Sequence, residues 1–167
     1  MMRNFASLAL LTLALLALAS CEDDSGKPYL SFAGGGFIFN YRIGEAHYGF
    51  VLRPERRLPE GAVIEAELEN PAGGPPFRSS LPVKTGQLQY VFQSPPVKGV
   101  QANREYKVTV RLYDPQSGAD YARYSNVYRT NVDQASLPDK PLVVGPGYAK
   151  NPEVDYRNIV PDPKPQQ

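Results

Sequence analysis

The segment Ala62-Val63-Ile64-Glu65-Ala66-Glu67-Leu68-Glu69 shows the clearest strand-like alternation in the chain. Ala62, Ile64, Ala66 and Leu68 occupy alternate positions, and glutamates follow the last three of them. Successive side chains of a β-strand point to opposite sides, so this alternation predicts one buried face and one solvated face. The same period of two recurs from Tyr29 to about Val132, between turns rich in glycine and proline.

Other stretches repeat this alternation and predict further half-buried strands. The residues expected on their inward faces are Phe37, Phe39, Tyr41 and Ile43; Tyr48, Phe50 and Leu52; Leu88, Tyr90 and Phe92; and Tyr106, Val108, Val110 and Leu112. A weaker segment at 80–83 and a more polar one at 124–132 bring the total to about seven strands. This organisation predicts an all-β fold, namely a single antiparallel β-sandwich.

The segment Val100-Gln101-Ala102-Asn103-Arg104-Glu105-Tyr106 resembles the tyrosine corner of fibronectin type III domains. In that family an apolar residue lies six positions before a strand tyrosine, whose hydroxyl bonds back to the backbone. The resemblance covers at most residues 29–132 and implies an Ig-like or fibronectin III-like sandwich. Ala102 stands where proline is usual, the chain has no tryptophan, and a core tyrosine without a corner would give the same pattern.

The first 20 residues have the features of a signal peptide. Arg3 lies in a short positive n-region, and an apolar region rich in leucine and alanine extends from Phe5 to Ala17. That apolar region is short for a transmembrane helix, which needs about 20 residues. We therefore expect residues 1–20 to be removed from the mature protein.

The motif Leu18-Ala19-Ser20-Cys21 consists of an aliphatic residue, two small residues and the single cysteine of the chain. It resembles the lipobox of bacterial lipoproteins. The resemblance implies that Leu18, Ala19 and Ser20 are recognised by the signal peptidase and that cleavage occurs before Cys21. It also implies that Cys21 carries a diacylglycerol and an N-acyl lipid, and two or more acyl chains anchor a protein stably.

The lipobox implies a location in the bacterial cell envelope, lipid-anchored to a membrane. The outer membrane, facing the periplasm, is favoured. The inner membrane stays open because Glu22-Asp23-Asp24 follow the cysteine, and an acidic residue there favours retention in some diderm bacteria. Residues 22–28 form a short polar tether with a reach of roughly 25 Å at full extension, which keeps the domain close to the lipid.

The charge balance argues against a nucleic-acid partner. Of the 18 Lys and Arg residues only Arg3 precedes Cys21, whereas all 17 Asp and Glu residues follow it, so the mature chain is formally neutral. Nucleic-acid binding requires many phosphate-neutralising Lys and Arg residues, which this chain does not concentrate in any long block.

The sequence contains no recognisable catalytic or metal-binding set. His47, the single histidine, is predicted to face solvent opposite Tyr48, and no Gly-x-Ser-x-Gly motif accompanies it. Zinc sites draw on several His or Cys residues, of which the chain has one each. We therefore predict no enzyme activity, no catalytic residue, no metal and no cofactor other than the covalent lipid.

Three further motifs are explained by ordinary structure. Ala33-Gly34-Gly35-Gly36 lacks the Gly-Lys-Ser or Gly-Lys-Thr of a phosphate-binding loop and is predicted to form a flexible turn. The segment 114–120 has oxygen ligands but no EF-hand pattern, so a turn is favoured over a calcium site. Glu65, Glu67 and Glu69 are predicted to form a solubilising stripe.

Two groups of side chains are candidates for a contact surface. The first crowds the last two predicted strands and their loop, and it comprises Tyr113, Tyr121, Tyr124 and Tyr128. Tyrosines suit protein interfaces and sugar platforms, and they equally suit packing within a sheet. The second group is the densest basic patch, which could meet lipid head groups or an acidic partner or form a solvated loop, and it comprises Arg53, Arg56 and Arg57.

Residues 133–167 are predicted to form a Pro-rich extended tail, because alternation stops and seven prolines follow Leu137. Either this segment is a frayed end, or it docks on a partner through its apolar patches, Pro141-Leu142-Val143-Val144 and Asn158-Ile159-Val160.

The expected organisation is a signal peptide (1–20), a lipidated tether (21–28), a β-sandwich domain (29–132) and the tail (133–167). We expect a membrane-anchored, non-catalytic lipoprotein that acts as an accessory or adaptor protein in a bacterial envelope complex. Its expected partners are the membrane and an envelope protein. The alternative is a ligand-binding sandwich, with carbohydrate as the candidate ligand.

Overall fold

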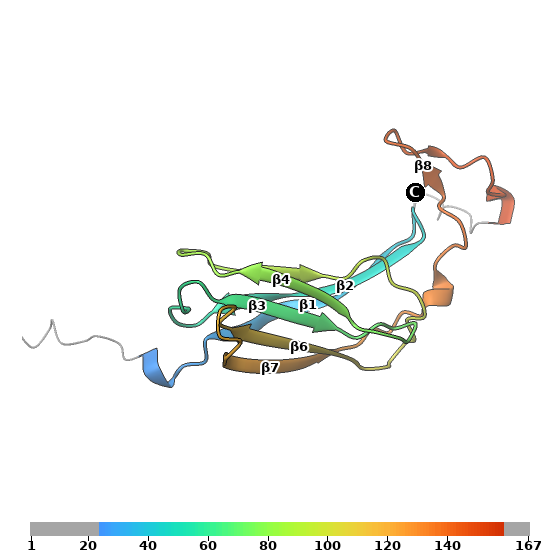
Figure 1. Cartoon of the computed structure of the whole chain (residues 1–167). Helices are drawn as coiled ribbons and strands as arrows, with labels where there is room; N and C mark the ends of the chain where they lie inside the picture. Colours follow the sequence, from blue (N-terminus) through green and yellow to red (C-terminus); the bar gives the residue numbers. More distant parts are fainter. Residues whose placement is uncertain (1–23, 159–167) are drawn as a thin grey trace, which may run out of the picture.

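Two antiparallel sheets pack face to face in the computed structural model, which describes residues 24–158 (Figure 1). The three-stranded sheet has the order β1-β2-β5, formed by Leu30–Asn40, Glu45–Pro54 and Tyr90–Gln93. The four-stranded sheet has the order β4-β3-β6-β7, formed by Phe77–Pro82, Val63–Leu68, Tyr106–Tyr113 and Asp120–Tyr128. The predicted all-β sandwich is confirmed.

The remaining described elements are short. A two-stranded hairpin follows the sandwich, with β8 at Val143–Val144 and β9 at Ala149–Lys150. Three 3-10 turns are present: η2 at Asp24–Gly26, η3 at Gln134–Ser136 and η4 at Tyr156–Asn158.

The core consists of the alternate residues that the sequence predicts. In β3, Ile64, Ala66 and Leu68 are at most 1% exposed, and β2 and β6 bury every second residue in the same way. Full burial of a large apolar side chain contributes about 1.5–3 kcal/mol, so the two inner faces supply most of the driving force for folding.

Three residues predicted to point inward do not lie in strands. β1 ends at Asn40, which leaves Tyr41 and Ile43 in the β1–β2 turn, with Tyr41 46% exposed. β5 begins at Tyr90, and Leu88 in the preceding loop is 82% exposed. The period of two continues past the last ladder hydrogen bond, so the pattern overestimates the length of these strands. The last strand likewise covers 120–128 instead of 124–132.

The prediction of a flexible turn at Gly34-Gly35-Gly36 is wrong, because these residues lie inside β1. The strand shifts register between Phe32 and Gly34, then pairs with β2 as far as Asn40. A Cβ atom on Gly35 would lie 2.6 Å from the carbonyl oxygen of Gly49 and 2.7 Å from the ring of Tyr128 on β7. The missing side chain therefore allows the edge of one sheet to approach the edge of the other.

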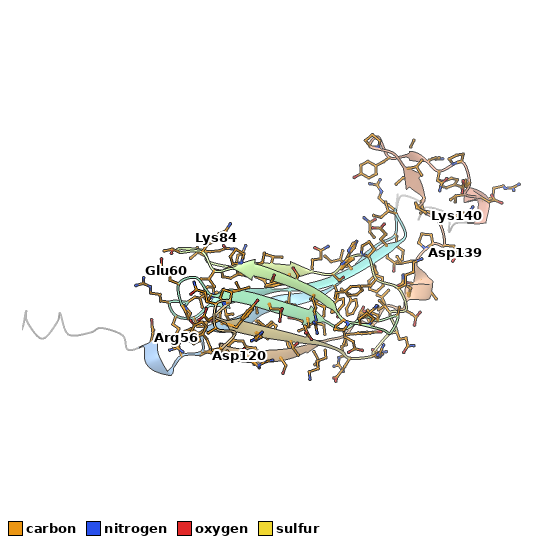
Figure 2. The ribbon with its side chains drawn as sticks, viewed as in Figure 1. Arg56, Glu60, Lys84, Asp120, Asp139 and Lys140 are labelled. Atoms are coloured by element: carbon orange, nitrogen blue, oxygen red, sulfur yellow. The ribbon has the colours of Figure 1, made fainter. Side chains whose placement is uncertain are left out.

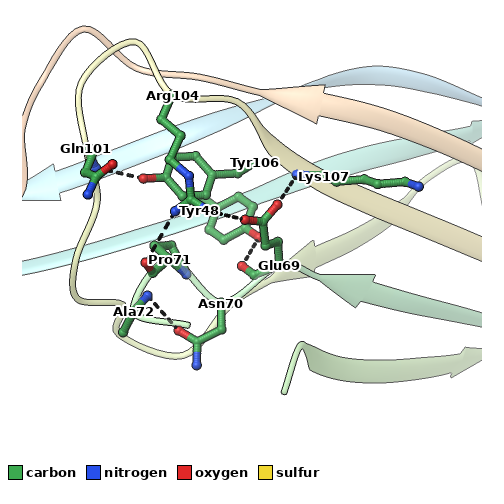
Figure 3. A network of polar contacts seen from close by, with 9 residues as sticks. All are labelled: Tyr48, Glu69, Asn70, Pro71, Ala72, Gln101, Arg104, Tyr106 and Lys107. Carbon is green, nitrogen blue, oxygen red and sulfur yellow. Dashed lines mark hydrogen bonds and ion pairs between the residues drawn. The ribbon is translucent and has the colours of Figure 1, made fainter. Parts of the chain in front are cut away.

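The predicted tyrosine-corner contact is present at Tyr106. Its hydroxyl accepts a hydrogen bond of 2.7 Å from the backbone N–H of Gln101, and its ring is fully buried (Figure 3). The Arg104 guanidinium lies 4.6 Å from the centre of that ring. Loop 101–105 is thereby held against the strand that it precedes.

Glu69 does not belong to a purely solvating stripe. Its carboxylate accepts hydrogen bonds from the Arg104 side chain at 2.6 Å and from the backbone N–H of Lys107 at 2.9 Å (Figure 3). The backbone carbonyl of Glu69 accepts a bond from the buried hydroxyl of Tyr48, and burial raises the pKa of that hydroxyl. β3, β6 and β2 are thus joined at one end of the sandwich.

Replacing Gly35 tests the close approach of the sheet edges. Gly35→Ala should lower the free energy of unfolding by about 1–3 kcal/mol, because the backbone carbonyl of Gly49 cannot move away without breaking the β1–β2 ladder. Urea denaturation monitored by tyrosine fluorescence measures this change. Gly36→Ala is the matched control, since Gly36 has nearly the same backbone φ (+153°, against +157° at Gly35) and nothing lies within 4 Å of its Cβ position. Equal stability of the two variants would contradict the steric explanation.

Candidate functional site

The sandwich has two distinct ends. The proximal end carries the start of β1, since Leu30 pairs with Pro54 at the end of β2, and Tyr90 pairs with Leu52 nearby. The distal end carries the β1–β2 turn at residues 41–44 and the segment that follows β7. Figure 1 shows η2 entering at the proximal end and β8 standing beyond the distal end.

The predicted lipobox, Leu18, Ala19, Ser20 and Cys21, lies outside the described residues. Within residues 24–158 the helices are 3-10 turns, and none has the length or apolarity needed to span a membrane. Nor do three or more His, Cys, Asp or Glu side chains converge as a metal site in this part of the chain.

The four candidate tyrosines do not form one surface. Tyr124 and Tyr128 point from β7 toward β1: the Tyr124 hydroxyl accepts hydrogen bonds from the N–H groups of Tyr29 (3.0 Å) and Leu30 (3.3 Å). The Tyr128 hydroxyl donates to the carbonyl of Gly34, and its ring stacks on Phe50 at 6.2 Å. These two rings close the gap between the sheets.

The other two candidate tyrosines lie at the proximal end. Tyr121 is 42% exposed and meets Tyr29 edge to face at 6.4 Å. Tyr113 is half-buried beneath the guanidinium of Arg111, 4.2 Å from its ring centre. Tyr121 is therefore the member of the four that remains most available for contact.

The three candidate arginines differ in environment although they are close in sequence. The Arg53 guanidinium pairs with Glu55 at 2.9 Å, and Arg56 stacks over the ring of Tyr29 at 3.6 Å. Arg57 is exposed. The hydrogen bond from Ser31, together with the one from Arg53, holds the pKa of Glu55 below its ordinary value. The patch is thus partly neutralised. It lies at the proximal end, where Arg53 pairs with Ser31 of β1 and where Figure 2 shows Arg56.

His47 points away from Tyr48 as predicted, but it is not solvent-facing. Its side chain is 20% exposed and its Nδ1 atom lies 3.2 Å from the carbonyl oxygen of Ser94. Nε2 lies 3.4 Å from Glu45. These contacts place His47 in a structural role against the chain that follows β5.

The loop at 114–119 is a hydrogen-bonded turn. Asp114 accepts bonds from the Ser117 hydroxyl at 2.7 Å and the Gln116 N–H at 2.9 Å, and these bonds lower its pKa. Asp120 accepts from both Arg111 and Arg123, and the bond from Arg111 is the main cause of its lowered pKa. The carboxylate oxygens of this loop that were considered as calcium ligands are therefore hydrogen-bonded within the protein.

The segment after β7 is folded, and its placement is the main feature that the sequence did not predict. Leu137 is 7% exposed and belongs to the core, so the chain stays attached to the sandwich up to that point. Residues 138–158, which we call the distal arm, then lie beside the β1–β2 turn. There the carbonyl of Arg42 accepts from the N–H groups of Leu142 (2.7 Å) and Val143 (3.2 Å).

Asn151 holds the distal arm together. It is 6% exposed; its side-chain amide donates to the carbonyl of Pro141 at 2.7 Å, and its side-chain oxygen accepts from the N–H of Glu153 at 3.0 Å. Its backbone N–H donates to the Tyr156 hydroxyl at 2.8 Å, and that hydroxyl donates to the carbonyl of Leu142. The arm therefore has a defined shape between Pro138 and Tyr156.

The expectation of an extended tail is thus not met for residues 133–158, whereas residues 159–167, with Ile159 and Val160 of the second apolar patch, lie outside the described residues. A sequence signal for the hairpin was available. Gly145-Pro146-Gly147 separates two short segments, and glycine and proline at such a position are typical turn residues. The proline content concealed this signal.

Comparison with known proteins identifies no family for this chain. No family model and no curated protein matches the chain. Among solved structures, β-glucuronidase from Parabacteroides merdae has a TM-score of 0.45 and 10% identity, over 62% of this chain and 14% of that one. A Bacteroides uniformis β-glucuronidase has a TM-score of 0.38 and 12% identity, over 61% and 13%. The chain spans only a small share of these enzymes, and their activity is not assigned to it.

Substitution of Asn151 should open the distal arm without unfolding the sandwich. Asn151→Ala leaves the Pro141 carbonyl and the Glu153 N–H without their partner, which costs about 1–3 kcal/mol. Amide hydrogen exchange at Leu142 and Asn151 should accelerate roughly 10- to 100-fold, while exchange in β3 and β6 stays unchanged.

Glu153→Gln is the matched control for this experiment. It changes a neighbouring side chain whose ion pair with Lys140 at 3.1 Å is exposed, and such pairs contribute about 0–1 kcal/mol. If Asn151→Ala and Glu153→Gln exchange at the same rate, Asn151 does not hold the arm.

Proposed function

We propose that this chain is a lipid-anchored, non-catalytic adaptor protein of the bacterial cell envelope. Lipid on Cys21 holds the proximal end of the sandwich at a membrane, and the distal arm contacts a partner protein. The observation that carries the proposal is that the tether and the ordered arm lie at opposite ends of the sandwich (Figure 1).

The dimensions of β1 support this arrangement. Its 11 residues lead from the proximal to the distal end, which at about 3.3 Å per residue corresponds to roughly 35 Å. The described part of the tether is compact, because the N–H of Lys27 bonds to the carbonyl of Asp24 in η2. An anchored sandwich therefore has the dimensions to hold the arm well clear of the lipid head groups.

The distal arm has the properties of a contact surface for a protein. Tyr148 is 62% exposed and Val144 is 40% exposed, on either side of the Gly145-Pro146-Gly147 turn. The guanidinium of Arg42 lies 5.7 Å from the Tyr148 ring centre, which adds a cation beside an aromatic ring. Because Asn151 orders the arm in advance, binding would cost less conformational entropy than it would for an unstructured tail.

The alternative, a carbohydrate-binding module, has one supporting feature. A shallow groove of about 430 Å³ crosses the outer face of the four-stranded sheet, and it contains Glu65, Thr109 and Arg123. Its polar lining suits hydroxyl groups. This alternative is less favoured, because the aromatic residue that lines the groove, Tyr124, is partly buried and its hydroxyl is bonded to the backbone of Tyr29 and Leu30.

The lipid anchor can be tested directly. Wild-type protein from a bacterial host should incorporate labelled palmitate and have a mature mass that begins at the acylated Cys21. Cys21→Ser should lose the label and the membrane association, whereas Ser20→Ala should keep both, because it retains a small residue at the cleavage site. An unlipidated wild-type protein would overturn this part of the proposal.

The adaptor role can be tested by capture of partners from crosslinked membranes. Deletion of residues 138–167 retains the buried Leu137, so the sandwich should remain folded. A partner recovered with the wild-type protein and with Glu153→Gln should fall about tenfold or more with the deletion and with Asn151→Ala.

Two results would contradict the adaptor role. Equal recovery of the partner with all four proteins would exclude the arm as its contact surface. If none of them captures a partner while the soluble Cys21→Ser chain binds glycans, the carbohydrate-binding alternative would replace the proposal.

A further inference from the structure

The proximal end exposes an apolar side chain that packing within the protein does not explain. Leu88 is 82% exposed, the highest value among the large hydrophobic residues of the described chain. It lies in the loop between β4 and β5, two residues before Tyr90, which pairs with Leu52 at the proximal end of the sheet. The register thus places Leu88 at the same end as Leu30, where the tether joins the sandwich.

Two exposed cations lie at the same end of the sandwich as Leu88. Lys84, in the same loop, and Arg57, in the β2–β3 loop, are both exposed, and both line a hollow of about 140 Å³ between the two loops. Glu60 is the acidic residue that lines the same hollow. Figure 2 shows Lys84, Glu60 and Arg56 together at the proximal end.

Three other acidic groups of the proximal end have cationic partners within the protein, and Asp114 accepts hydrogen bonds from the Ser117 hydroxyl and the Gln116 N–H instead. Asp24 pairs with Lys27 at 2.8 Å, Glu55 pairs with Arg53, and Asp120 pairs with two arginines. Among residues 24–158, Lys84 and Arg57 have no ion pair, so their charges are available to an external anion.

An aromatic side chain is exposed at the same end. Tyr121 stands against Tyr29, which directly precedes β1 and lies beneath the Arg56 guanidinium. Tyrosine has an apolar ring and a polar hydroxyl, and it is enriched at the level of lipid head groups in membrane proteins. An exposed leucine, cations and a tyrosine at one end are the side chains that interfacial membrane contact uses.

We infer that the proximal end is a membrane-contacting face, in which Leu88 enters the lipid interface while Lys84 and Arg57 contact anionic lipid phosphates. The inference rests on the proposed lipid anchor, because a tether of at most roughly 25 Å keeps this end beside the bilayer. The inference adds to the proposed anchor a defined orientation of the sandwich relative to the membrane. The sandwich stands with β1 directed away from the membrane, and the distal arm is held farthest from it.

The orientation can be measured with a fluorescent label on the full chain. Cys21 is the single cysteine, so lipidation leaves an introduced cysteine as the free thiol for an environment-sensitive dye. Leu88→Cys is compared with Tyr148→Cys, which carries the dye on the exposed distal arm. Both lipidated proteins are reconstituted into vesicles of phosphatidylethanolamine and phosphatidylglycerol.

At position 88 we expect blue-shifted emission, quenching by nitroxide-labelled lipids, and iodide quenching reduced about threefold or more relative to position 148. Combining Leu88→Cys with Lys84→Gln and Arg57→Gln should reduce the protection at position 88, and vesicles without phosphatidylglycerol should do the same. Val127→Cys, which is 48% exposed on the outer face of β7, controls for general crowding of the dye at the vesicle surface.

The outcomes separate this inference from the proposed anchor. Mass spectrometry first establishes whether Cys21 is acylated; absence of lipid overturns the anchor and the inference with it. If Cys21 is acylated but positions 88, 127 and 148 are equally open to iodide, the anchor stands and the orientation is wrong. Protection of position 88 in native membranes but not in pure lipid vesicles would identify a protein as the contact and would overturn the inference.

Discussion

β1 pairs with β2 along its whole length, from the pair Leu30 and Pro54 to the pair Asn40 and Glu45. This ladder positions both the tether and the distal arm. Its start receives the tether, and its turn supplies the Arg42 carbonyl on which the distal arm rests. The ladder must also lie beside β7 of the opposite sheet. Gly35 satisfies that requirement, because any side chain there would meet the Gly49 carbonyl and the Tyr128 ring.

Tyrosine hydroxyls perform a repeated structural task in this protein. Those of Tyr90, Tyr106, Tyr124 and Tyr156 each accept a hydrogen bond from a backbone N–H that lies outside the regular strand ladders or at their ends. A buried N–H without a partner costs about 1–3 kcal/mol, so each hydroxyl makes a loop or a chain end compatible with packing. The high tyrosine content therefore reflects how loops are fastened to the sandwich more than it reflects a binding surface.

The two ends of the sandwich expose different side chains, and the proposed function assigns a different contact to each end. The proximal end combines cations with exposed Leu88 and Tyr121, whereas the distal end carries a preformed arm with exposed Val144 and Tyr148. A protein held by lipid at one end and bearing an ordered surface at the other can restrict a partner to a set height above a membrane. In that arrangement the sandwich, whose core residues are almost completely buried, would be the spacer between the two ends.

Residue alternation was enough to predict most strands and their inward faces, and a short motif predicts the lipobox, because both are local properties of the chain. The ends of the strands depend on tertiary structure, because ladder hydrogen bonds, and not apolar residues, define their limits. For this reason the alternation in the sequence wrongly places Leu88 and Tyr41 in strands. The inclusion of the three glycines in β1 could not be predicted from the sequence either. The need for a glycine at position 35 depends on its contact with Tyr128, which lies far away in the sequence. The arm was missed likewise: Asn151 and Tyr156 hold it by contacts that no period in the sequence encodes.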